Sequence, residues 1–318
     1  MRDAATVDVS VVITTRNRAD LLKASLDTLG SVDTPSFAWE LLVVDNGSND
    51  HTRNVLEQAR TMLPLEILTV VRAGKTRAQN VAVAHARGKL VAFSDDDVVF
   101  DPAWLNELAS AAARWPDASI FGGQIDIALP SQVPEWLQGS EMRPLLERLC
   151  ARYAPRVDEG ETDQAPLGPN MAIRACALTD VRFDENVGPD GTHDYIKGGD
   201  TDLCHVLAER GHRFVYVPKA RIIHHVREGQ LELSSIIEGM FRRGRKNAYL
   251  NPKPAKVLIG HAPVSLWFAL ARQWLRYLAC RSLSTHTRYK VGSKLFFRRG
   301  YLYQYRLQQK ALKSGQRS

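Results

Sequence analysis

The first 125 residues alternate short apolar runs with helix-length amphipathic segments, and this alternation restricts the possible folds most strongly. Such alternation indicates repeated βα units, in which helices cover both faces of a mainly parallel sheet. We expect strands at residues 7–14, 39–45, 65–71, 89–95 and 118–125. We expect helices at residues 19–30, 49–63, 76–88 and 102–115. The pattern predicts an α/β protein with a Rossmann-like sheet flanked by helices.

Residues 126–240 begin with a segment that shows no regular helix or strand pattern. Residues 126–197 are rich in Pro, Gly and charge, so we expect binding loops around one helix near 140–153. Regular patterns return with a helix at 198–211 and strands at 213–217 and 221–226. The sequence therefore predicts that the α/β domain extends to about residue 240.

Composition limits the class of protein. The chain has 318 residues, 44% of them apolar, so a sizeable core can form. The start, "MRDAATVDVS", lacks the pattern of a signal peptide, and no run of 18 apolar residues occurs. The cysteines lack the paired spacings of zinc sites, and we expect them to be reduced; they are Cys150, Cys176, Cys204 and Cys280. These features predict a cytoplasmic protein without a spanning helix.

Charge is distributed unevenly along the chain. Residues 1–240 hold 24 Lys and Arg and all 35 Asp and Glu, whereas residues 241–318 hold 18 Lys and Arg and no acid. The segment "SLWFALARQWLRYLACRS" places apolar residues near one helical face, with arginines beside them; these apolar residues are Trp267, Leu270, Trp274, Leu275 and Leu278. This pattern favours a basic helical extension on an anionic membrane surface. There are two alternatives. These helices could pack on the preceding domain, or they could bind RNA.

Three successive carboxylates, Asp95, Asp96 and Asp97, follow a buried strand. In an extended segment alternate side chains share a side, so we expect Asp95 and Asp97 to converge and Asp96 to point away. Carboxylates this close repel each other, and a divalent cation such as Mg²⁺ or Mn²⁺ removes the repulsion while binding phosphate oxygens. The carboxyl ends of strands are the usual ligand site of open α/β sheets. A solvated acidic turn is the alternative.

An ordered set of segments resembles the family 2 glycosyltransferases of GT-A fold. The segments are "VSVVITTRNRADLL", "LLVVDNGSNDHT", "GKTRAQNVAVAHARGKLVAFSDDDVVFDPAWL", "GPNMAIR", "GGDTDLCHVLAERGHRFVYVP" and "IIHH". The resemblance covers roughly residues 8–226 and extends more weakly to about 247. It implies an inverting, metal-dependent transfer of a sugar from a nucleoside-diphosphate sugar to a hydroxyl of a saccharide or lipid-linked acceptor. Polysaccharide or glycoconjugate biosynthesis is the implied setting.

The resemblance implies roles for the residues at the first strand ends. In "SDDD", Asp95 and Asp97 match the D-x-D motif that holds the metal and nucleotide, with Asp97 the direct metal ligand; Asp96 belongs to the same nucleotide site. Asp45 resembles the aspartate that recognises the base, with an Asx turn in "DNGSND" as the alternative. Nucleotide contacts are also implied for Thr14, Arg16 and Arg77.

The second acidic motif, "GGDTDL", implies the catalytic base. Asp200 resembles the aspartate that accepts the proton of the acceptor hydroxyl in inverting members; a helix N-cap is the alternative. Asp202 is expected to interact with the helix dipole. Gly199 stands where many relatives have Glu, which leaves the support of the base open.

Residues further along the chain also have counterparts in the family. His224 resembles a histidine near the metal or diphosphate, and alternation sends His224 and His225 to opposite faces. Asn170 resembles a residue near the donor sugar and acceptor. The segment "FRRGRK" resembles an arginine-bearing helix near the active site, with Arg242, Arg243 or Arg245 as diphosphate ligands.

Together these features predict a GT-A catalytic domain over 1–240 and a basic, aromatic helical extension over 241–318. We expect the nucleotide-sugar-binding half in about 1–125 and the acceptor-binding half in about 126–240. A UDP-sugar is the first expected donor, with Mg²⁺ or Mn²⁺ as cofactor; nucleic acid is disfavoured as a partner. We expect a cytoplasmic protein, peripheral on the inner face of the membrane. A sugar nucleotidyltransferase is an alternative, although "TTRNRADLL" lacks the glycines of a triphosphate loop, and a non-catalytic nucleotide-sugar or membrane-binding module is another.

Overall fold

The computed structural model describes residues 7–33, 35–252 and 258–314, which form two compact units. The sheet unit contains residues up to 129, 145–185 and 199–226. The helical unit contains residues 130–144, 186–198 and 227 onward. The predicted boundary after residue 240 falls inside helix α7 (Leu233–Leu250). The two predicted domains also include residues 1–6, 34, 253–257 and 315–318, which lie outside the described residues.

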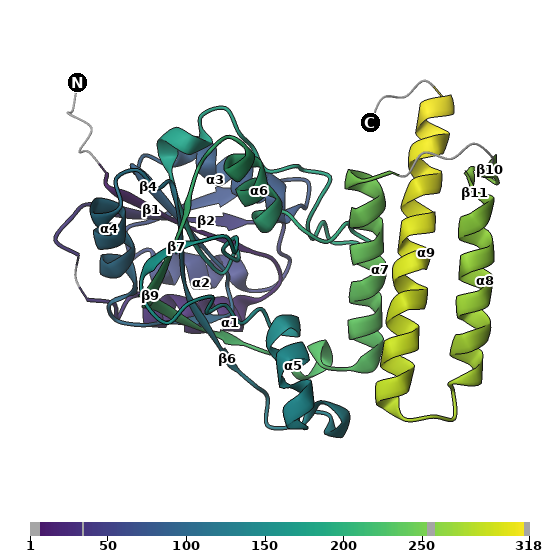
Figure 1. Cartoon of the computed structure of the whole chain (residues 1–318). Helices are drawn as coiled ribbons and strands as arrows, with labels where there is room; N and C mark the ends of the chain where they lie inside the picture. Colours follow the sequence, from purple (N-terminus) through teal and green to yellow (C-terminus); the bar gives the residue numbers. More distant parts are fainter. Residues whose placement is uncertain (1–6, 34, 253–257, 315–318) are drawn as a thin grey trace. The chain divides into compact units, whose positions relative to one another are not determined.

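The sheet unit is built on one large mixed sheet (Figure 1). Its strands are β1 (Val9–Thr15), β2 (Trp39–Asp45), β3 (Leu65–Thr69), β4 (Leu90–Ser94), β5 (Val98–Phe100), β6 (Ile120–Ala128), β7 (Gly160–Thr162), β8 (Asn170–Arg174) and β9 (Phe214–His225). They are ordered β3-β2-β1-β4-β8-β6-β9-β5, with β7 beside β9. The first four strands in this order are parallel, β8 is antiparallel to β4 and β6, and β6 and β9 are parallel.

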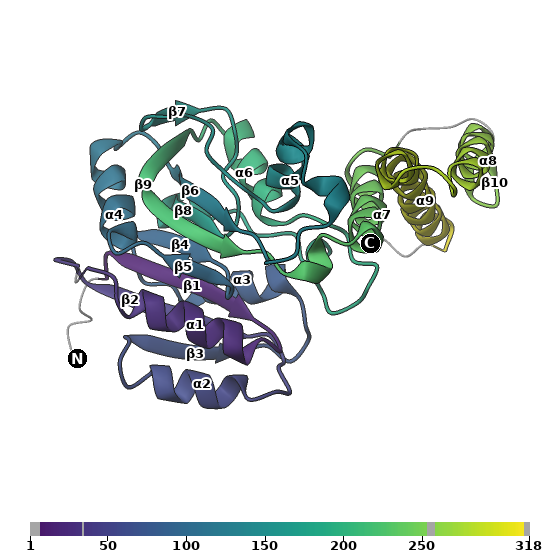
Figure 2. The same ribbon diagram turned by 90° about the horizontal axis from the view of Figure 1, so that it is seen from below.

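Helices cover both faces of this sheet (Figure 2). They are α1 (Ala19–Leu29), α2 (Thr52–Ala59), α3 (Lys75–His85), α4 (Trp104–Arg114) and α6 (Asp200–Glu209). Alternate residues of β1 face opposite cores: Val11 and Ile13 pack with α1, α2 and α4, whereas Val12 packs with α3 and α6. Burial on both faces explains why these strands are continuous apolar runs. The predicted α/β fold is confirmed.

Several elements differ from the sequence prediction. Strands β5, β7 and β8 were not predicted; β5 and β7 have only three residues each, too few to show a period. The two strands expected at 213–217 and 221–226 are one strand, β9, whose pairing with β6 shifts register between Gly123 and Ile125. A short helix, α5 (Arg143–Leu149), occupies part of the region expected at 140–153. Short 3₁₀ segments occur at Glu135–Leu137, Ser140–Met142, Ala175–Leu178 and Glu228–Gln230.

The helical unit contains the expected helical extension. Its long helices are α7, α8 (Val264–Ala279) and α9 (Thr285–Lys313), with a small hairpin of β10 (Leu258–Ile259) and β11 (Ala262–Pro263). Both views show α9 between α7 and α8 (Figures 1 and 2). Helices α7 and α9 approach closely because Gly244 and Gly300 lack side chains: a Cβ on either would collide with a carbonyl of the other helix, at Phe297 or Phe241. None of the helices in the described ranges is both long and apolar enough to cross a membrane.

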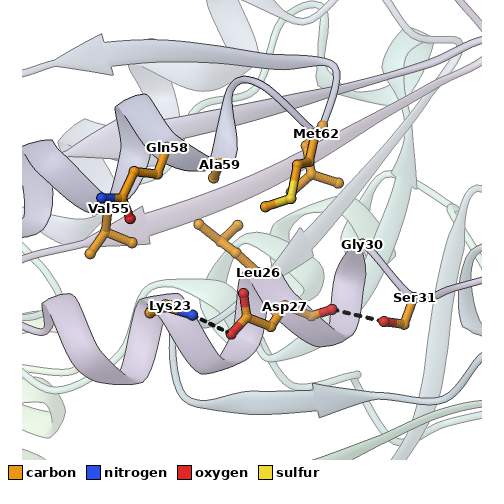
Figure 3. A pocket seen from close by; sticks show the side chains of 10 residues that line it. Lys23, Leu26, Asp27, Gly30, Ser31, Val55, Gln58, Ala59 and Met62 are labelled. Atoms are coloured by element: carbon orange, nitrogen blue, oxygen red, sulfur yellow. Dashed lines mark hydrogen bonds and ion pairs between the residues drawn. The ribbon is translucent and has the colours of Figure 1, made fainter.

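A cavity of about 250 Å³ lies between α1 and α2 (Figure 3). Its lining is largely apolar, with Leu26 and Met62 among the side chains and the Lys23–Asp27 ion pair at 2.7 Å on one side. The lining residues come from α1, α2 and the residues just after each helix. The predicted ligand residues are not among them, so this cavity is separate from the predicted ligand site.

Candidate functional site

The predicted ligand residues gather at one edge of the sheet. Strands β1, β2 and β4 are parallel, with Thr15 opposite Asp45 and Ile13 opposite Ser94, so all three leave the sheet at the same edge. Helices α1 and α3 begin there as well, shortly after β1 and β3. The carboxyl ends of the parallel strands thus bring together side chains that are far apart in sequence.

Arg18 holds two of the three successive aspartates. Its Nη1 atom lies 2.7 Å from Oδ1 of Asp96 and 3.1 Å from Oδ2 of Asp97. Residues 95–97 form a bend after β4 instead of continuing the strand. The expectation that Asp96 points away is therefore wrong, because alternation requires an extended backbone. Arg18, directly before α1, was not predicted as a site residue.

Burial makes this part of the site electrostatically unusual. Asp96 and Asp97 are only 3% and 4% exposed. Burial raises the pKa of Asp96; Arg18 opposes this shift and Asp97 adds to it, so the net direction is upward. Burial lowers the pKa of Arg18, but the neighbouring carboxylates outweigh it and the net direction is again upward. The two buried carboxyl groups of Asp96 and Asp97 thus share the single guanidinium of Arg18.

Lys75 joins the two acidic motifs. This first residue of α3 places Nζ 2.7 Å from Oδ1 of Asp95 and 3.5 Å from Oδ2 of Asp200. Burial lowers the pKa of Lys75, but Asp200 and Asp95 raise it by more. A positive charge at a helix N-terminus is unfavourable by itself, so the two carboxylates account for this position. Sequence analysis missed Lys75, although a lysine beginning a helix directly after Gly74 was an available signal.

Asp200 is held from several sides. Its Oδ1 atom accepts a hydrogen bond of 2.6 Å from Nε2 of Gln79, another residue not predicted. Gly168 lies so close that a Cβ there would collide with the Asp200 carboxylate. The N-cap of α6 is Gly199 and not Asp200, so the capping alternative does not describe this structure. The carboxylate of Asp200 is thereby oriented without serving as a cap.

Gly199 and Asp202 shape the start of α6. The Gly199 N–H donates to Oδ2 of Asp202 at 3.0 Å, which places Asp202 in the first helical turn as expected. Gly199 has φ of +122°, and a Cβ there would lie 2.8 Å from Cγ2 of Thr76. A glutamate at this position would be strained, which explains the departure noted in the sequence. The Asp200 carboxylate is instead contacted by Lys75 and Gln79.

His224, which is on β9, lies beside Asp97. Its Nε2 atom is 3.4 Å from Oδ1 of Asp97, and its Nδ1 atom is 3.2 Å from the carbonyl of Cys150. Burial lowers the pKa of His224, but Asp97 raises it by more. His224 is buried and His225 is exposed, so the predicted opposite orientation is confirmed.

Asp97 and His224 are the side chains that come nearest to forming a divalent-metal site at this edge. Across the described ranges, no group of three or more His, Cys, Asp or Glu side chains has a metal-ligating arrangement. Asp97 and His224 nevertheless bring a carboxylate oxygen and an imidazole nitrogen within 3.4 Å of each other. Such a pair fits a Mn²⁺-like ion whose remaining ligands are phosphate and water oxygens. Asp97 and His224 therefore fit the implied metal.

Asp45, Thr14 and Arg16 lie at the same edge. Oδ1 of the buried Asp45 accepts a hydrogen bond of 2.9 Å from the N–H of Ser48, so the Asx-type turn given as the alternative is present. Nε of Arg16 is buried and has no hydrogen-bond partner among the described residues. Thr14 is half-buried and opposite Val44 in the sheet. Their nucleotide contacts stay predictions.

Arg77 and Asn170 make their described contacts elsewhere. Nε of Arg77 pairs with Glu185 at 2.8 Å, and its Nη1 donates to two backbone carbonyls. Asn170 is fully buried: its Nδ2 donates to Gln124 and Ala220 carbonyls, and its Oδ1 accepts from Trp104 Nε1 at 2.8 Å. The contacts of Asn170 lie in the interior of the sheet unit and the ion pair of Arg77 lies near its surface. The predicted ligand roles of both residues stay predictions.

The arginines of "FRRGRK" belong to the helical unit. Arg242 donates to the His193 carbonyl and stacks over Tyr195, with 4.7 Å from Cζ to the ring centroid. Arg245 donates to Gln304 and lies 3.6 Å from Asp194. These contacts order the loop at 186–198 within its own unit. Diphosphate binding by Arg242, Arg243 or Arg245 stays a prediction.

Known proteins resemble this chain in sequence and fold. The family description "Glycosyl transferase family 2" matches residues 10–184. The succinoglycan biosynthesis protein ExoM of Rhizobium meliloti is 25% identical over 248 residues, which are 77% of this chain and 75% of ExoM. The structure of S. aureus TarS 1-349 with UDP-GlcNAc has a TM-score of 0.55 at 17% identity and covers 98% of this chain and 93% of that chain. The structure of mannosyltransferase PcManGT from Pyrobaculum calidifontis, with GDP-Man and Mn²⁺, has a TM-score of 0.55 at 20% identity. The match covers 96% of this chain and 86% of that chain.

These similarities differ in how much they establish. At such identities the solved structures establish the fold, and they confirm the predicted GT-A architecture. The chain spans 75% of the length of ExoM but only 41% of the length of another curated relative. The family match covers residues 10–184 of 318, more than half of the chain, and includes the strand ends that carry the acidic cluster. This chain therefore belongs to glycosyl transferase family 2, as the sequence motifs predicted.

Proposed function

We propose that this chain is an inverting, divalent-metal-dependent glycosyltransferase that moves a sugar from a nucleoside-diphosphate sugar to a hydroxyl of a saccharide or lipid-linked acceptor. The observation that carries the proposal is Lys75, which lies between Asp95 of the first acidic motif and Asp200 of the second. The side chain of Lys75 thus contacts both the proposed donor site and the proposed base. The name of ExoM supports a role in polysaccharide or glycoconjugate biosynthesis.

The donor class is supported by the nucleotide sugars in the related structures. TarS holds UDP-GlcNAc and PcManGT holds GDP-Man, so both ligands are nucleoside-diphosphate sugars with different bases and sugars. In this chain Asp45, Thr14 and Arg16 lie at the edge where the base and diphosphate would bind. The unpartnered Nε of Arg16 offers a buried donor for an anionic oxygen. A UDP-sugar is the first donor to test, and a GDP-sugar the second.

Asp200 is the proposed general base. Its carboxylate accepts the proton of the acceptor hydroxyl while that oxygen forms a bond to the anomeric carbon. The bond from the anomeric carbon to the diphosphate breaks in the same step, and the diphosphate leaves with the electron pair. Gln79 and Lys75 hold the carboxylate in one orientation, which is the requirement for a positioned base.

The metal would be held by Asp97 and His224, with Asp95 beside them. A bound divalent cation stabilises negative charge on a departing diphosphate. Arg18 balances part of the charge of Asp96 and Asp97 by direct contact. It thereby keeps Asp97 in place at the edge of the sheet, in the position from which its carboxylate would reach a ligand.

The proposal is tested by a screen of nucleotide sugars with Mn²⁺ or Mg²⁺, with released nucleoside diphosphate as readout. We expect one donor to be turned over, EDTA to abolish the activity, and added metal to restore it. Asp97→Asn should weaken donor binding and turnover together, whereas Asp117→Asn, at an exposed carboxylate, should change neither. Full activity of Asp97→Asn in EDTA would contradict the metal assignment.

Two outcomes of the same screen would replace the proposal. Formation of pyrophosphate from a nucleoside triphosphate and a sugar phosphate would indicate a sugar nucleotidyltransferase. Tight nucleotide-sugar binding without turnover, with or without acceptors, would indicate a non-catalytic binding module. Binding is measured by calorimetry on the same samples, so that loss of catalysis is distinguished from loss of the ligand.

A further inference from the structure

Helix α8 exposes an apolar face. Phe268, Trp274 and Leu275 are 74%, 51% and 62% exposed. The one residue of α8 classed as buried within the described part of the chain is the polar Gln273. Single exposed apolar residues are ordinary, but several on one helix face are typical of an interaction surface.

The contacts between α8 and α9 explain which face remains uncovered. Nε2 of Gln273 donates to the Val291 carbonyl at 3.1 Å, and Nη1 of Arg298 contacts the Ala269 carbonyl and Oε1 of Gln273 at 3.3 Å. Apolar contacts join the two helices as well, because Leu266, Trp267 and Leu270 pack against the cluster that contains Tyr301 and Leu302 of α9. Within the helical unit α8 lies at the edge, next to α9 (Figures 1 and 2). Helix α9 thus covers only part of the apolar surface of α8, and Phe268 and Leu275 stay exposed.

An open groove continues the apolar face. Its volume is about 520 Å³, and it is lined by Trp267, Leu270, Ala271, Trp274, Tyr277, Leu295, Phe296 and Arg299. Two arginines of α9 stack on its aromatic side chains: Cζ of Arg299 is 4.8 Å from the Phe296 ring centroid, and Cζ of Arg306 is 5.6 Å from that of Trp267. The aromatic surface is therefore bordered by positive charge.

Further positive charges flank α8 itself. Arg272 and Arg276 are exposed, one turn apart, next to the apolar face, and the exposed Arg281 follows the helix. No acidic residue occurs anywhere in residues 241–318. A second copy of this surface would bring the same uncompensated positive charges together, which is unfavourable. Charge complementarity instead favours an anionic surface that also accepts apolar side chains.

We propose that α8 lies in the interface of an anionic lipid membrane. Phe268, Trp274 and Leu275 enter the boundary between headgroups and acyl chains, and Arg272 and Arg276 contact lipid phosphates. A helix of 16 residues is shorter than the roughly 20 needed to span the hydrocarbon core, so α8 lies in the membrane plane. Two contributions to the binding free energy add together. One is the insertion of apolar side chains, and the other is the attraction of about 1 kcal/mol per basic residue near the surface.

The test is cosedimentation of the full chain with vesicles. Phosphatidylcholine vesicles with phosphatidylglycerol are compared with pure phosphatidylcholine, at ionic strengths of about 0.1 M and about 1 M, where the Debye length falls from about 10 Å to about 3 Å. We expect binding to the anionic vesicles at low salt, and at least about tenfold weaker binding in high salt or without the anionic lipid.

Two double variants separate the apolar and charge terms. Phe268→Ser with Leu275→Ser should weaken binding at least about tenfold even at low salt. Arg272→Gln with Arg276→Gln should weaken it by about 30-fold at low salt and have little effect at high salt. The control is Met62→Ser with Val157→Ser in the sheet unit, whose side chains are 72% and 88% exposed and which should leave binding unchanged.

Other results would overturn the proposal. Equal binding to both vesicle types, or none to either, would do so. So would concentration-dependent dimerisation in light scattering that the Phe268 and Leu275 variant abolishes, because the face would then be a self-association surface. Melting temperatures are measured for all variants; a large loss in the α8 variants alone would show that these side chains pack inside the protein.

Discussion

The sheet unit and the helical unit depart from ordinary burial in opposite directions. The sheet unit buries charged groups, with Asp96 and Asp97 almost inaccessible to solvent at its ligand edge. The helical unit exposes apolar groups, with Phe268 and Leu275 largely accessible on α8. Both arrangements are unfavourable for an isolated protein in water, and a second molecule of suitable chemistry would relieve each of them. We propose a divalent cation with phosphate for the first and lipid for the second.

A buried carboxylate elsewhere in the sheet unit shows that burial alone is not enough. Glu40, near the amino end of β2, accepts hydrogen bonds from Ser10 Oγ at 2.6 Å and Arg87 Nε at 2.7 Å. Burial raises the pKa of Glu40, but these hydrogen bonds lower it by more, whereas the pKa of Asp96 is shifted upward. Hydrogen bonds thus outweigh burial for the pKa of Glu40, whereas burial prevails for that of Asp96.

The largest effect is expected for Asp200. Asp200→Asn should lower turnover by about 10² to 10⁴, because the amide cannot accept the acceptor's proton. Donor affinity should remain nearly unchanged, since the proposed donor contacts come from other residues. Turnover number and donor dissociation constant are measured separately. Asp202→Asn, which alters only the start of α6, is the matched control; loss of donor affinity with normal turnover in Asp200→Asn would assign that residue to binding.

A smaller effect is expected for Lys75, which tests the link between the two motifs. Lys75→Met should lower kcat/KM by about 10², because Asp95 and Asp200 would lose their shared partner and repel each other. The split between KM and kcat shows whether the donor side or the base side depends more on the ammonium. Lys89→Met, at an exposed lysine paired with Asp8, should leave both unchanged. An unaffected Lys75→Met enzyme would remove Lys75 from the mechanism.

Glu40 should affect stability and its pH dependence rather than activity. Its pKa in the folded protein lies below the ordinary 4.5, so its stabilisation is present above about pH 4.5 and is lost as pH falls through the folded pKa. Glu40→Gln should cost about 1 to 3 kcal/mol near neutral pH and flatten the acid limb of the stability curve. Denaturant unfolding at several pH values measures this. An unchanged acid limb would contradict the assigned role.

The smallest effect is expected on α8. Phe268→Ser should change the free energy of unfolding by no more than about 0.5 kcal/mol, because the side chain is exposed and few contacts are lost. Leu295→Ser, at a buried position of α9, should cost several times more. Thermal unfolding of the two variants gives the comparison. Equal losses would show that the two faces of the helical unit do not differ as described.

The sequence predicted the sheet unit well because burial on both faces leaves a continuous apolar signal. The strand-end position of Asp95, Asp96 and Asp97 followed directly from that pattern. Their partners did not: Arg18 and Lys75 reach the aspartates only because α1 and α3 begin at the same edge, across sequence separations of up to 79 residues. Residue spacing does not specify such contacts.

Asn170 illustrates a further limit of the same kind. Its predicted ligand role came from the resemblance of "GPNMAIR" to a family segment and stays a prediction. Neither the resemblance nor residue spacing could show that Trp104, Gln124 and Ala220 contact its amide in the interior. The short strands β5 and β7 were missed because three residues carry no usable period. Site residues at the ends of long strands were thus easier to predict than those whose surroundings come from distant loops.

The close approach of α7 and α9 has a consequence for how the helical unit tolerates sequence change. Since any side chain at Gly244 or Gly300 would meet backbone of the opposite helix, substitutions there cannot be absorbed by repacking a neighbour. In a random library selected for folding alone, we expect both positions to remain glycine while Phe268, Trp274 and Leu275 diversify freely. Selection for attachment to lipid would restore the aromatic and aliphatic residues of α8. The first selection would thus conserve the glycines that allow the helices to pack, and the second would conserve the exposed residues of α8 that are proposed to contact lipid.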